Sequence, residues 1–215
     1  MVELASNDGY LLKNFKKAGV PCLGIEPTDS TAAAAEALGI EVWRQFFGEN
    51  LAKEIQTQRG SSDLIIGNNV YAHVPDINDF TRGMKQLLKP EGTITLEFPH
   101  LMNLMLGVQF DTVYHEHYSY LSLYAVQRIF EKAGLMIYDV EEIETHGGSL
   151  RIYGAHADCK KLVSPAVSAL LLKEEEAGLR HKSLYENFQA KVNKVKNGLL
   201  KFLIECNENG KKIIA

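Results

Sequence analysis

The sequence predicts an α/β fold built on a doubly wound, seven-stranded sheet, followed by a C-terminal helical extension. Two observations carry this prediction. Through the first half of the chain, short apolar strands alternate with helical segments, and each strand is nearly continuous in apolar residues, as in a parallel sheet covered on both faces. Two further strand-like runs are then joined by Thr145-His146-Gly147-Gly148, whose Gly-Gly pair is typical of a tight antiparallel hairpin.

The strands are predicted from short runs rich in apolar residues. These runs lie at residues 2–5, 22–25, 40–43, 63–66, 93–98, 135–144 and 149–156. The turn-forming Ser6-Asn7-Asp8-Gly9 follows the first run, and Glu26-Pro27 ends the second. We expect Lys89-Pro90-Glu91-Gly92 to separate the fifth strand from the helix before it.

Helices are predicted where apolar residues recur at three- and four-residue spacing. They cover residues 10–18, 29–38, 49–58, 77–88 and 121–133. Gly19 and Gly39 act as stop signals for the first two. Asp29 or Ser30 is expected to cap the alanine-rich second helix.

From Ser164 onward the pattern is helical. One long amphipathic helix is predicted from an apolar stripe formed by Leu184, Phe188, Val192, Val195, Leu199, Phe202 and Cys206. We expect this stripe to pack on the domain or on the segment 165–177 rather than to form a binding surface. Asn209-Gly210 ends the helix, and residues 211–215 resemble the start of another strand.

Length and composition indicate one globular domain with a smaller appendage. The chain has 215 residues, of which 46% are hydrophobic and 23% charged. We divide it into a domain at 1–160, a helical extension or linker at 161–210, and the start of a truncated C-terminal domain at 211–215. Because strand-like segments lie at both ends, we expect the sequence to be a fragment of a longer protein.

The same data disfavour a nucleic-acid partner, a membrane span, a signal peptide and a cysteine-based framework. A net charge of −4 argues against nucleic acid, which needs a basic face. No apolar run is long enough to cross a bilayer, and the first residues do not show the regions of a signal peptide. Cys22, Cys159 and Cys206 are far apart and fit neither a disulfide framework nor a zinc knuckle. We expect a cytoplasmic protein, either a monomer or a dimer.

The segment Ala5-Ser6-Asn7-Asp8-Gly9, between the first strand and the first helix, has the character of a nucleotide-binding loop. Small residues let backbone amides approach a ligand, although any tight turn of this type would use them. Glu26 ends the second strand, at about the separation where an acidic side chain binds ribose hydroxyls. The loop, Glu26 and Pro27 are therefore candidate cofactor-binding residues.

Further candidates follow the third and fourth strands, at the carboxyl edge where such sheets bind ligands. Phe46 and Phe47 offer a ring to lie against adenine, and packing in the core explains them equally well. Asn68 and Asn69 end the fourth strand. We take Phe46, Asn68 and Asn69 as candidate cofactor-binding residues.

Residues 109–120, Gln-Phe-Asp-Thr-Val-Tyr-His-Glu-His-Tyr-Ser-Tyr, concentrate groups that take, give or orient a proton. We expect a loop over the sheet edge, where function is common, although solvated histidines and packed rings are equally consistent with this composition. His115 and His117 also allow a metal pair, but they lack a second cluster to complete it, so no metal is predicted. His73 is expected within reach of this loop, and Glu97 and His100 are weaker candidates.

Three segments together resemble the sugar C-methyltransferases: Asn69–Asp76, Gln109–Tyr120 and Thr145–Arg151. The resemblance implies a Rossmann-like methyltransferase sheet. It also implies S-adenosylmethionine as methyl donor, S-adenosylhomocysteine as product, and a nucleotide-linked 4-keto-deoxysugar methylated at C3. In that family a zinc-binding domain precedes this one and a sugar-nucleotide-binding domain follows it. This chain has no Cys-x-x-Cys pair, so any zinc would belong to a flanking domain.

The resemblance also implies the catalytic residues. The base falls on His117, with Tyr114, Glu116 and His73 as its companions. A carbon beside a ketone becomes nucleophilic only when a base removes its proton and a donor stabilises the enolate oxygen. Glu116 would orient the imidazole or favour its charged form, and Tyr114 or His73 would donate to the enolate.

Other readings stay open at this stage. His146, Ser149 and Arg151 are further candidates to face the substrate, although a hairpin explains the glycines between them without function. Methyl transfer to oxygen or nitrogen of another small molecule would need a base but no enolate stabiliser. A cofactor-binding module that is inactive without flanking domains is the alternative outside enzymes.

Overall fold

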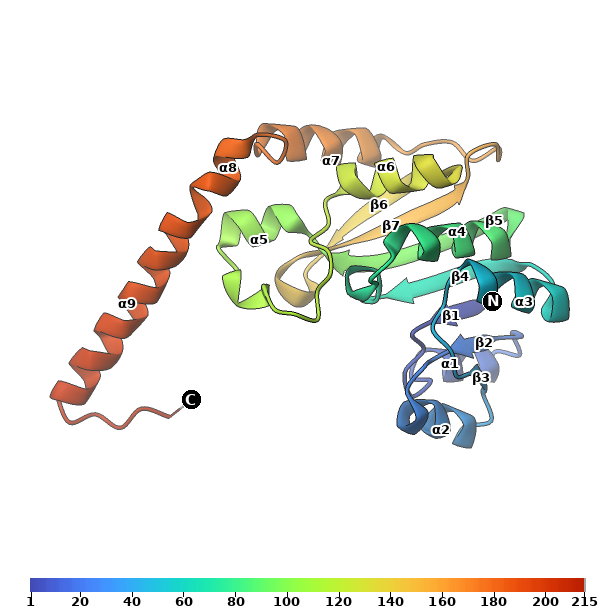
Figure 1. Ribbon diagram of the computed structural model, residues 1–215, viewed down its shortest axis with the longest axis horizontal. Helices are drawn as coiled ribbons and strands as arrows, with labels where there is room; N and C mark the ends of the chain where they lie inside the picture. The colour runs from blue at the N-terminus through green and yellow to red at the C-terminus, as the bar shows by residue number, and fades with distance from the viewer. Residues whose placement is uncertain (215) are drawn as a thin grey trace.

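The computed structural model describes residues 1–214 and joins the predicted strands in one 7-stranded sheet (Figure 1). The strands are β1 (Val2–Leu4), β2 (Leu23–Ile25), β3 (Glu41–Trp43), β4 (Ser62–Asn68), β5 (Leu88–Pro99), β6 (Leu135–Ile143) and β7 (Ser149–His156). Their order across the sheet is β3-β2-β1-β4-β5-β7-β6. Strands β1 to β5 are parallel, and β7 is antiparallel to both its neighbours. The predicted sheet and its closing antiparallel strand are confirmed.

Helices connect these strands largely as predicted. They are α1 (Leu12–Lys17), α2 (Asp29–Ala37), α3 (Glu49–Arg59), α4 (Ile77–Leu87), α5 (Leu101–Gly107), α6 (Leu123–Ala133), α7 (Pro165–Glu176), α8 (Lys182–Glu186) and α9 (Phe188–Glu208). Three short 3-10 turns add η1 (Tyr71–His73), η2 (Phe110–Thr112) and η3 (Thr145–Gly147). Helix α5, which lies between β5 and the loop at residues 109–120, has no counterpart among the helices predicted from the sequence.

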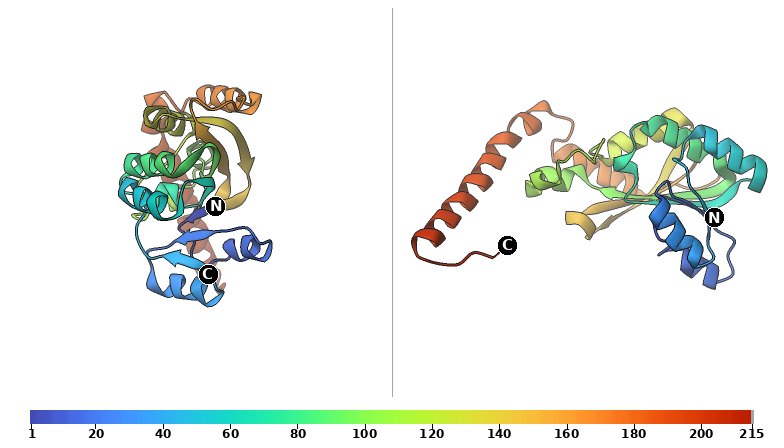
Figure 2. Two further views of the ribbon diagram at one scale, coloured as in Figure 1. Left: turned by 90° about the vertical axis from the view of Figure 1, so that its right-hand side faces the viewer. Right: turned by 60° about the horizontal axis from the view of Figure 1, so that its bottom comes forward.

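Both faces of the sheet are covered where β1, β2 and β3 lie. Alternate strand residues pack with α3 and α4 in the main core: Val2, Leu4, Leu23, Ile25 and Trp43. Met1, Cys22 and Val42, which directly precede Val2, Leu23 and Trp43, pack on a smaller cluster formed by Leu12 of α1, Ala35 of α2 and Ile40. Figure 2 shows α3 and α4 on one side of the sheet and α1 on the other. Two apolar faces explain the continuous apolar runs of these strands.

In β5 only every second residue is buried, because helices cover only one face of the sheet there. Ile94, Leu96 and Phe98 are buried, whereas the alternate Thr95 and Glu97 are half-buried. β5 also begins at Leu88, so the predicted break at residues 89–92 is wrong. The pairing of β5 with β4 changes register near these residues, which accommodates a proline inside the strand.

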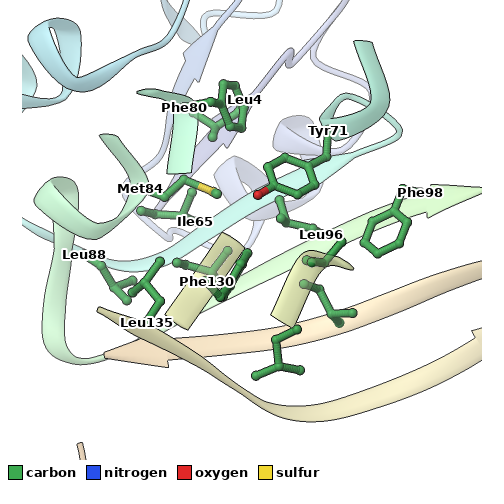
Figure 3. Packing of buried hydrophobic residues seen from close by; sticks show 14 of the residues in the cluster. Leu4, Ile65, Tyr71, Phe80, Met84, Leu88, Leu96, Phe98, Phe130 and Leu135 are labelled. Atoms are coloured by element: carbon green, nitrogen blue, oxygen red, sulfur yellow. The ribbon is translucent and has the colours of Figure 1, made fainter. Parts of the chain in front are cut away.

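Tyr71, the first residue of η1, is held in place by the main core. Its side chain is fully buried among Phe80, Phe98 and Phe130, as Figure 3 shows. Its hydroxyl shares a 2.6 Å hydrogen bond with Thr81, so the buried polar atom has a partner. An aromatic side chain buried to this degree anchors η1 firmly.

Two local predictions are corrected. Thr28, not Asp29 or Ser30, is the N-cap residue of α2 and gives no side-chain cap. Asp29 is already helical, and its carboxylate pairs with Arg44 at 3.0 Å. The β6–β7 connection is also longer than a tight two-residue turn. It contains η3, and His146, Gly147 and Gly148 all have positive φ, at 53°, 79° and 107°.

The C-terminal extension is helical as predicted, but α9 does not pack on the domain. Helix α7 lies against β6 and α6, whereas α9 extends away from the sheet (Figures 1 and 2). No residue of α9 is buried, and Leu199 and Phe202 are 57% and 59% exposed. The prediction that its apolar stripe packs on the domain or on α7 is therefore wrong. The apolar side of α7, with Val167 and Leu170, is already used on the main core.

Residues 211–214 have no regular secondary structure, so the strand predicted from residue 211 does not form in this described part; Ala215 lies outside it. An isolated strand has no hydrogen-bond partner to stabilise it. None of the helices within residues 1–214 combines the length and apolar character that a membrane span requires.

Candidate active site

The loop after β1 has the backbone shape expected of a ligand-binding turn. Ala5, Asn7 and Gly9 all have positive φ, at 55°, 51° and 76°. Gly9 needs this conformation and also the absence of a side chain, because a Cβ there would collide with Ile40. Left-handed residues other than glycine are uncommon and concentrate at functional sites.

Glu26 connects this loop to the end of β2. Its side chain is buried, and its carboxylate accepts hydrogen bonds from the backbone N–H groups of Asn7 (3.1 Å) and Thr28 (2.9 Å). A carboxylate has about four acceptor positions, so two remain for a ligand. Glu26 therefore holds the loop and keeps acceptor positions that these two backbone groups do not use.

Glu3, in the middle of β1, is a buried acidic residue beside this loop that is not among the candidates predicted from the sequence. It is 6% exposed, and burial raises its pKa to about 7. Glu3 Oε2 and the hydroxyl oxygen of buried Ser6 have no hydrogen-bond partner among the described residues. Buried polar atoms without a partner are rare and often belong to binding sites, so the residues present fit a polar cofactor beside this loop.

A cleft of about 480 Å³ lies beside the loop, and we call it the cofactor cleft after the role that the sequence predicts for this loop. Ala5, Pro27, Phe46, Val70 and His73 are among its lining residues. Of the two candidate aromatic residues, Phe47 packs edge-on against Phe80, with ring centroids 5.2 Å apart. Phe46 is 85% exposed and is the ring available to a ligand.

The two asparagines at the end of β4 do not lie in the cofactor cleft. Asn68 is exposed and lines neither cleft described here. Asn69 has φ of 52° and donates its backbone N–H to the Glu97 carbonyl at 2.9 Å. It lines a second cleft, of about 330 Å³, which we call the substrate cleft. Val70, rather than Asn68 or Asn69, lines the cofactor cleft.

The loop at residues 109–120, here called the catalytic loop, is fixed near both of its ends. The carbonyl of buried Ala72 accepts from the backbone N–H groups of Tyr118 (2.9 Å) and Ser119 (3.1 Å). At the N-terminal end, the Gln109 side chain donates to the Gly147 carbonyl at 2.8 Å. The anchored η1 turn and the β6–β7 connection therefore hold this irregular segment in place.

His117 has one defined tautomer in this arrangement. Its Nδ1 lies 3.0 Å from the Thr112 carbonyl oxygen. Because a carbonyl only accepts, Nδ1 carries the proton and Nε2 presents a lone pair. The Tyr114 hydroxyl lies 3.5 Å from Nε2, and both residues line the substrate cleft. A neutral imidazole with an exposed lone pair can act as a general base.

His73 and His117 lie side by side, with ring centroids 4.7 Å apart. Burial lowers the pKa of His73, and the neighbouring His117 lowers it further. Nδ1 of His73 donates to the Glu116 carbonyl at 3.1 Å, so neutral His73 also presents a lone pair at Nε2. Tyr114 is then the better hydrogen-bond donor to an enolate.

The other titratable residues of the catalytic loop contribute less to the two clefts and to the histidine pair. His115 is exposed and lines neither cleft, in contrast to His117. The Glu116 carboxylate is exposed and makes no described hydrogen bond to His117; its main-chain carbonyl, instead, positions His73. Asp111 lines the substrate cleft. Tyr120 lies edge-on to His117, with ring centroids 5.7 Å apart.

Of the three candidates near the β6–β7 connection, only His146 lines the substrate cleft. Buried Ser149 donates its hydroxyl to the Thr145 carbonyl at 2.9 Å. Arg151 pairs with Glu97 of β5 and with Glu141 of β6. These ion pairs join three strands and account for Arg151 and Glu97 structurally.

The two clefts meet at the pair of histidines. His73 lines the cofactor cleft, His117 lines the substrate cleft, and their rings are in contact. Asn69 and Val70, which are adjacent in the chain, line opposite clefts. A group held in one cleft could therefore react with a molecule held in the other. Within residues 1–214, no three His, Cys, Asp or Glu side chains gather in a metal-binding group.

Comparison with solved structures defines the fold. Magnesium protoporphyrin IX methyltransferase (ChlM) from Synechocystis PCC 6803, solved with bound SAH, matches with a TM-score of 0.56 and 15% sequence identity. The match covers 72% of this chain and 73% of that chain. At this identity the likeness shows the fold alone. The chain has the Rossmann-like fold of S-adenosylmethionine-dependent methyltransferases.

Comparison with known sequences adds the family. Residues 1–140 match the family model described as methyltransferase domain, and residues 144–215 match the C-methyltransferase C-terminal domain. Because the first match spans more than half of the chain, the chain belongs to the family of this methyltransferase domain, and its last third carries the match to the C-methyltransferase C-terminal domain. C-methyltransferase NovU from Streptomyces niveus is 33% identical over 99% of this chain and 51% of its own length. Ubiquinone biosynthesis O-methyltransferase from Rhodopseudomonas palustris (strain BisA53) is 24% identical over 45% of this chain and 38% of its own. The chain thus spans about half the length, or less, of these relatives.

Proposed function

We propose that this chain transfers a methyl group from S-adenosylmethionine to C3 of a nucleotide-linked 4-keto-deoxysugar. The observation that carries the proposal is the tautomer of His117. Its Nε2 lone pair lies on the Tyr114 side of the ring, where both residues line the substrate cleft and the cofactor cleft adjoins. A base and a hydrogen-bond donor at one point are the groups that enolate formation needs.

In this mechanism His117 Nε2 removes the proton from C3, and the electron pair moves into the neighbouring carbonyl. The Tyr114 hydroxyl donates to the resulting enolate oxygen, while Thr112 keeps the imidazolium oriented through Nδ1. His73, whose pKa is lowered by burial, stays neutral beside the charged His117. S-adenosylmethionine, when bound, would supply an electrophilic methyl carbon to the enolate carbon, with its sulfur as the leaving group.

Three observations support carbon as the acceptor and a sugar nucleotide as the substrate. The relative NovU is a C-methyltransferase by name, and the match to it spans almost this whole chain. The motifs at residues 69–76, 109–120 and 145–151 resemble those of sugar C-methyltransferases. The structure brings residues from all three segments to the substrate cleft: Asn69, His117 and His146.

Deuterium exchange tests the proposal in the full-length protein. With a 4-keto sugar nucleotide in deuterated solvent and no methyl donor, the substrate C3 proton should exchange in the wild type. His117→Ala should lower the exchange and kcat by about 10²–10⁴-fold, the range of base catalysis, while both ligands still bind.

The matched control is His115→Ala, because His115 is exposed and outside both clefts. Exchange should be unchanged in that variant. Wild-type exchange in His117→Ala would refute the assigned base. Loss of exchange in His115→Ala alone would transfer the role to His115. Methylation of oxygen or nitrogen without any C3 exchange would refute the proposed reaction.

A further inference from the structure

His100, a weak candidate in the sequence, lies at a junction of four segments. It follows β5 directly and is 1% exposed. Its backbone N–H donates to Gly148 at 3.0 Å, and its carbonyl accepts from Leu104 at 3.2 Å. It also forms a β-bridge with Leu121, immediately after the catalytic loop. His100 therefore joins β5, α5, the β6–β7 connection and the end of the catalytic loop.

The His100 side chain pairs with Glu174, which comes from α7 and is also 1% exposed. The distance from His100 Nε2 to Glu174 Oε1 is 2.8 Å. The same carboxylate accepts from the backbone N–H groups of Leu123 (2.6 Å) and Tyr124 (3.0 Å), at the start of α6. Because a carboxylate only accepts, His100 Nε2 donates. Glu174 thus holds the α6 start, where a negative group is favourable.

The other ring nitrogen, His100 Nδ1, is buried and has no hydrogen-bond partner among the described residues. His100 also lines a small cavity of about 10 Å³ together with Thr112, His117, Ser119 and Tyr120 of the catalytic loop. This volume is close to the smallest that holds one ordered water. A water here would give the unpaired buried nitrogen a hydrogen-bond partner and so stabilise the junction.

We propose that His100 and Glu174 are positioning residues for His117, which act through the backbone that follows the catalytic loop and through the small cavity beside it. Glu174 fixes the backbone that follows the loop. His100 Nδ1 accepts a hydrogen bond from one ordered water, which in turn contacts the loop residues lining the small cavity. Together they keep the His117 ring on the Thr112 carbonyl, with its Nε2 lone pair toward the substrate cleft. This inference rests on the proposed role of His117.

Kinetic measurements on full-length variants test the effect on catalysis. Glu174→Gln keeps the side-chain shape but cannot accept from all three donors, and His100→Phe removes both ring nitrogens. Each should lower C3 exchange and kcat by roughly 10- to 100-fold, as expected for a catalytic group displaced by about 1 Å. KM for the sugar nucleotide and Kd for S-adenosylhomocysteine should change less than about twofold.

Two further variants separate positioning from general damage to the fold. His100→Gln can still donate to Glu174, so it should restore most of the exchange lost in His100→Phe. Glu175→Gln makes the same chemical change one residue along α7, at a side chain that pairs with Arg180 at the surface. It should leave exchange at the wild-type rate.

A spectroscopic readout on the same full-length protein does not depend on turnover. Nitrogen-15 NMR of labelled histidines should show His117 as the single Nδ1–H tautomer at neutral pH in the wild type. Glu174→Gln and His100→Phe should produce a mixture of tautomers. Wild-type tautomer and wild-type exchange in either folded variant would overturn the inference. If the wild type shows no C3 exchange, the proposed function fails, while the tautomer comparison still decides the positioning role.

Discussion

Replacing Glu26 by glutamine tests how the chain would hold the ribose of its cofactor. The Glu26 carboxylate accepts from two backbone amides, those of Asn7 and Thr28. A glutamine side chain has one oxygen, so one of these N–H groups would face an NH₂ group. The variant also loses the charge in the hydrogen bond expected to the ribose hydroxyls.

Loss of one charge-assisted hydrogen bond costs about 1.5–3 kcal/mol. In binding, this corresponds to a roughly 10- to 150-fold higher Kd for S-adenosylhomocysteine, measured by calorimetry without added metal. Glu36→Gln is the matched control, because Glu36 makes only a surface ion pair with Arg44. A Kd within about twofold of the wild type in Glu26→Gln would place the ribose elsewhere and refute this reasoning.

Three other predictions follow from the same geometry. Burial raises the pKa of the Glu3 carboxyl from 4.5 to about 7, so the free protein should lose up to about 3 kcal/mol of stability as pH rises between these values. In Glu3→Gln, the free energy of unfolding measured by thermal unfolding should not decline over this pH range. A decline equal to that of the wild type would contradict the raised pKa of Glu3. Phe46→Ala should weaken S-adenosylhomocysteine binding by about 0.5–1.5 kcal/mol without lowering Tm, whereas a lower Tm would indicate a core role. Leu199→Gln, on exposed α9, should change the free energy of unfolding by less than about 0.5 kcal/mol, and a larger loss would mean that α9 packs on the domain.

Local sequence patterns were sufficient to predict the sheet. Seven strand runs, the alternation with helices and the closing hairpin all follow from short-range apolar patterning, which depends on neighbours in the chain. The same information located the loop with His117, because that loop breaks periodicity and concentrates titratable groups. Glu3 could have been found as well, since it is a lone charged residue inside an apolar strand.

Contacts between residues that are distant in the sequence decided the role of Glu174, the choice between the two histidines and the exposure of α9. Glu174 lies in a run of charged residues on α7 that is indistinguishable from a solvated helix surface, and only the packing of α7 on α6 brings it to His100. The choice between His115 and His117 depends on which ring reaches the Thr112 carbonyl and the substrate cleft. The apolar stripe of α9 has the spacing of a packed helix, yet it is exposed because α7 already covers the core beside it. Periodicity shows that a helix has an apolar side, but the position of the neighbouring elements determines whether that side is buried.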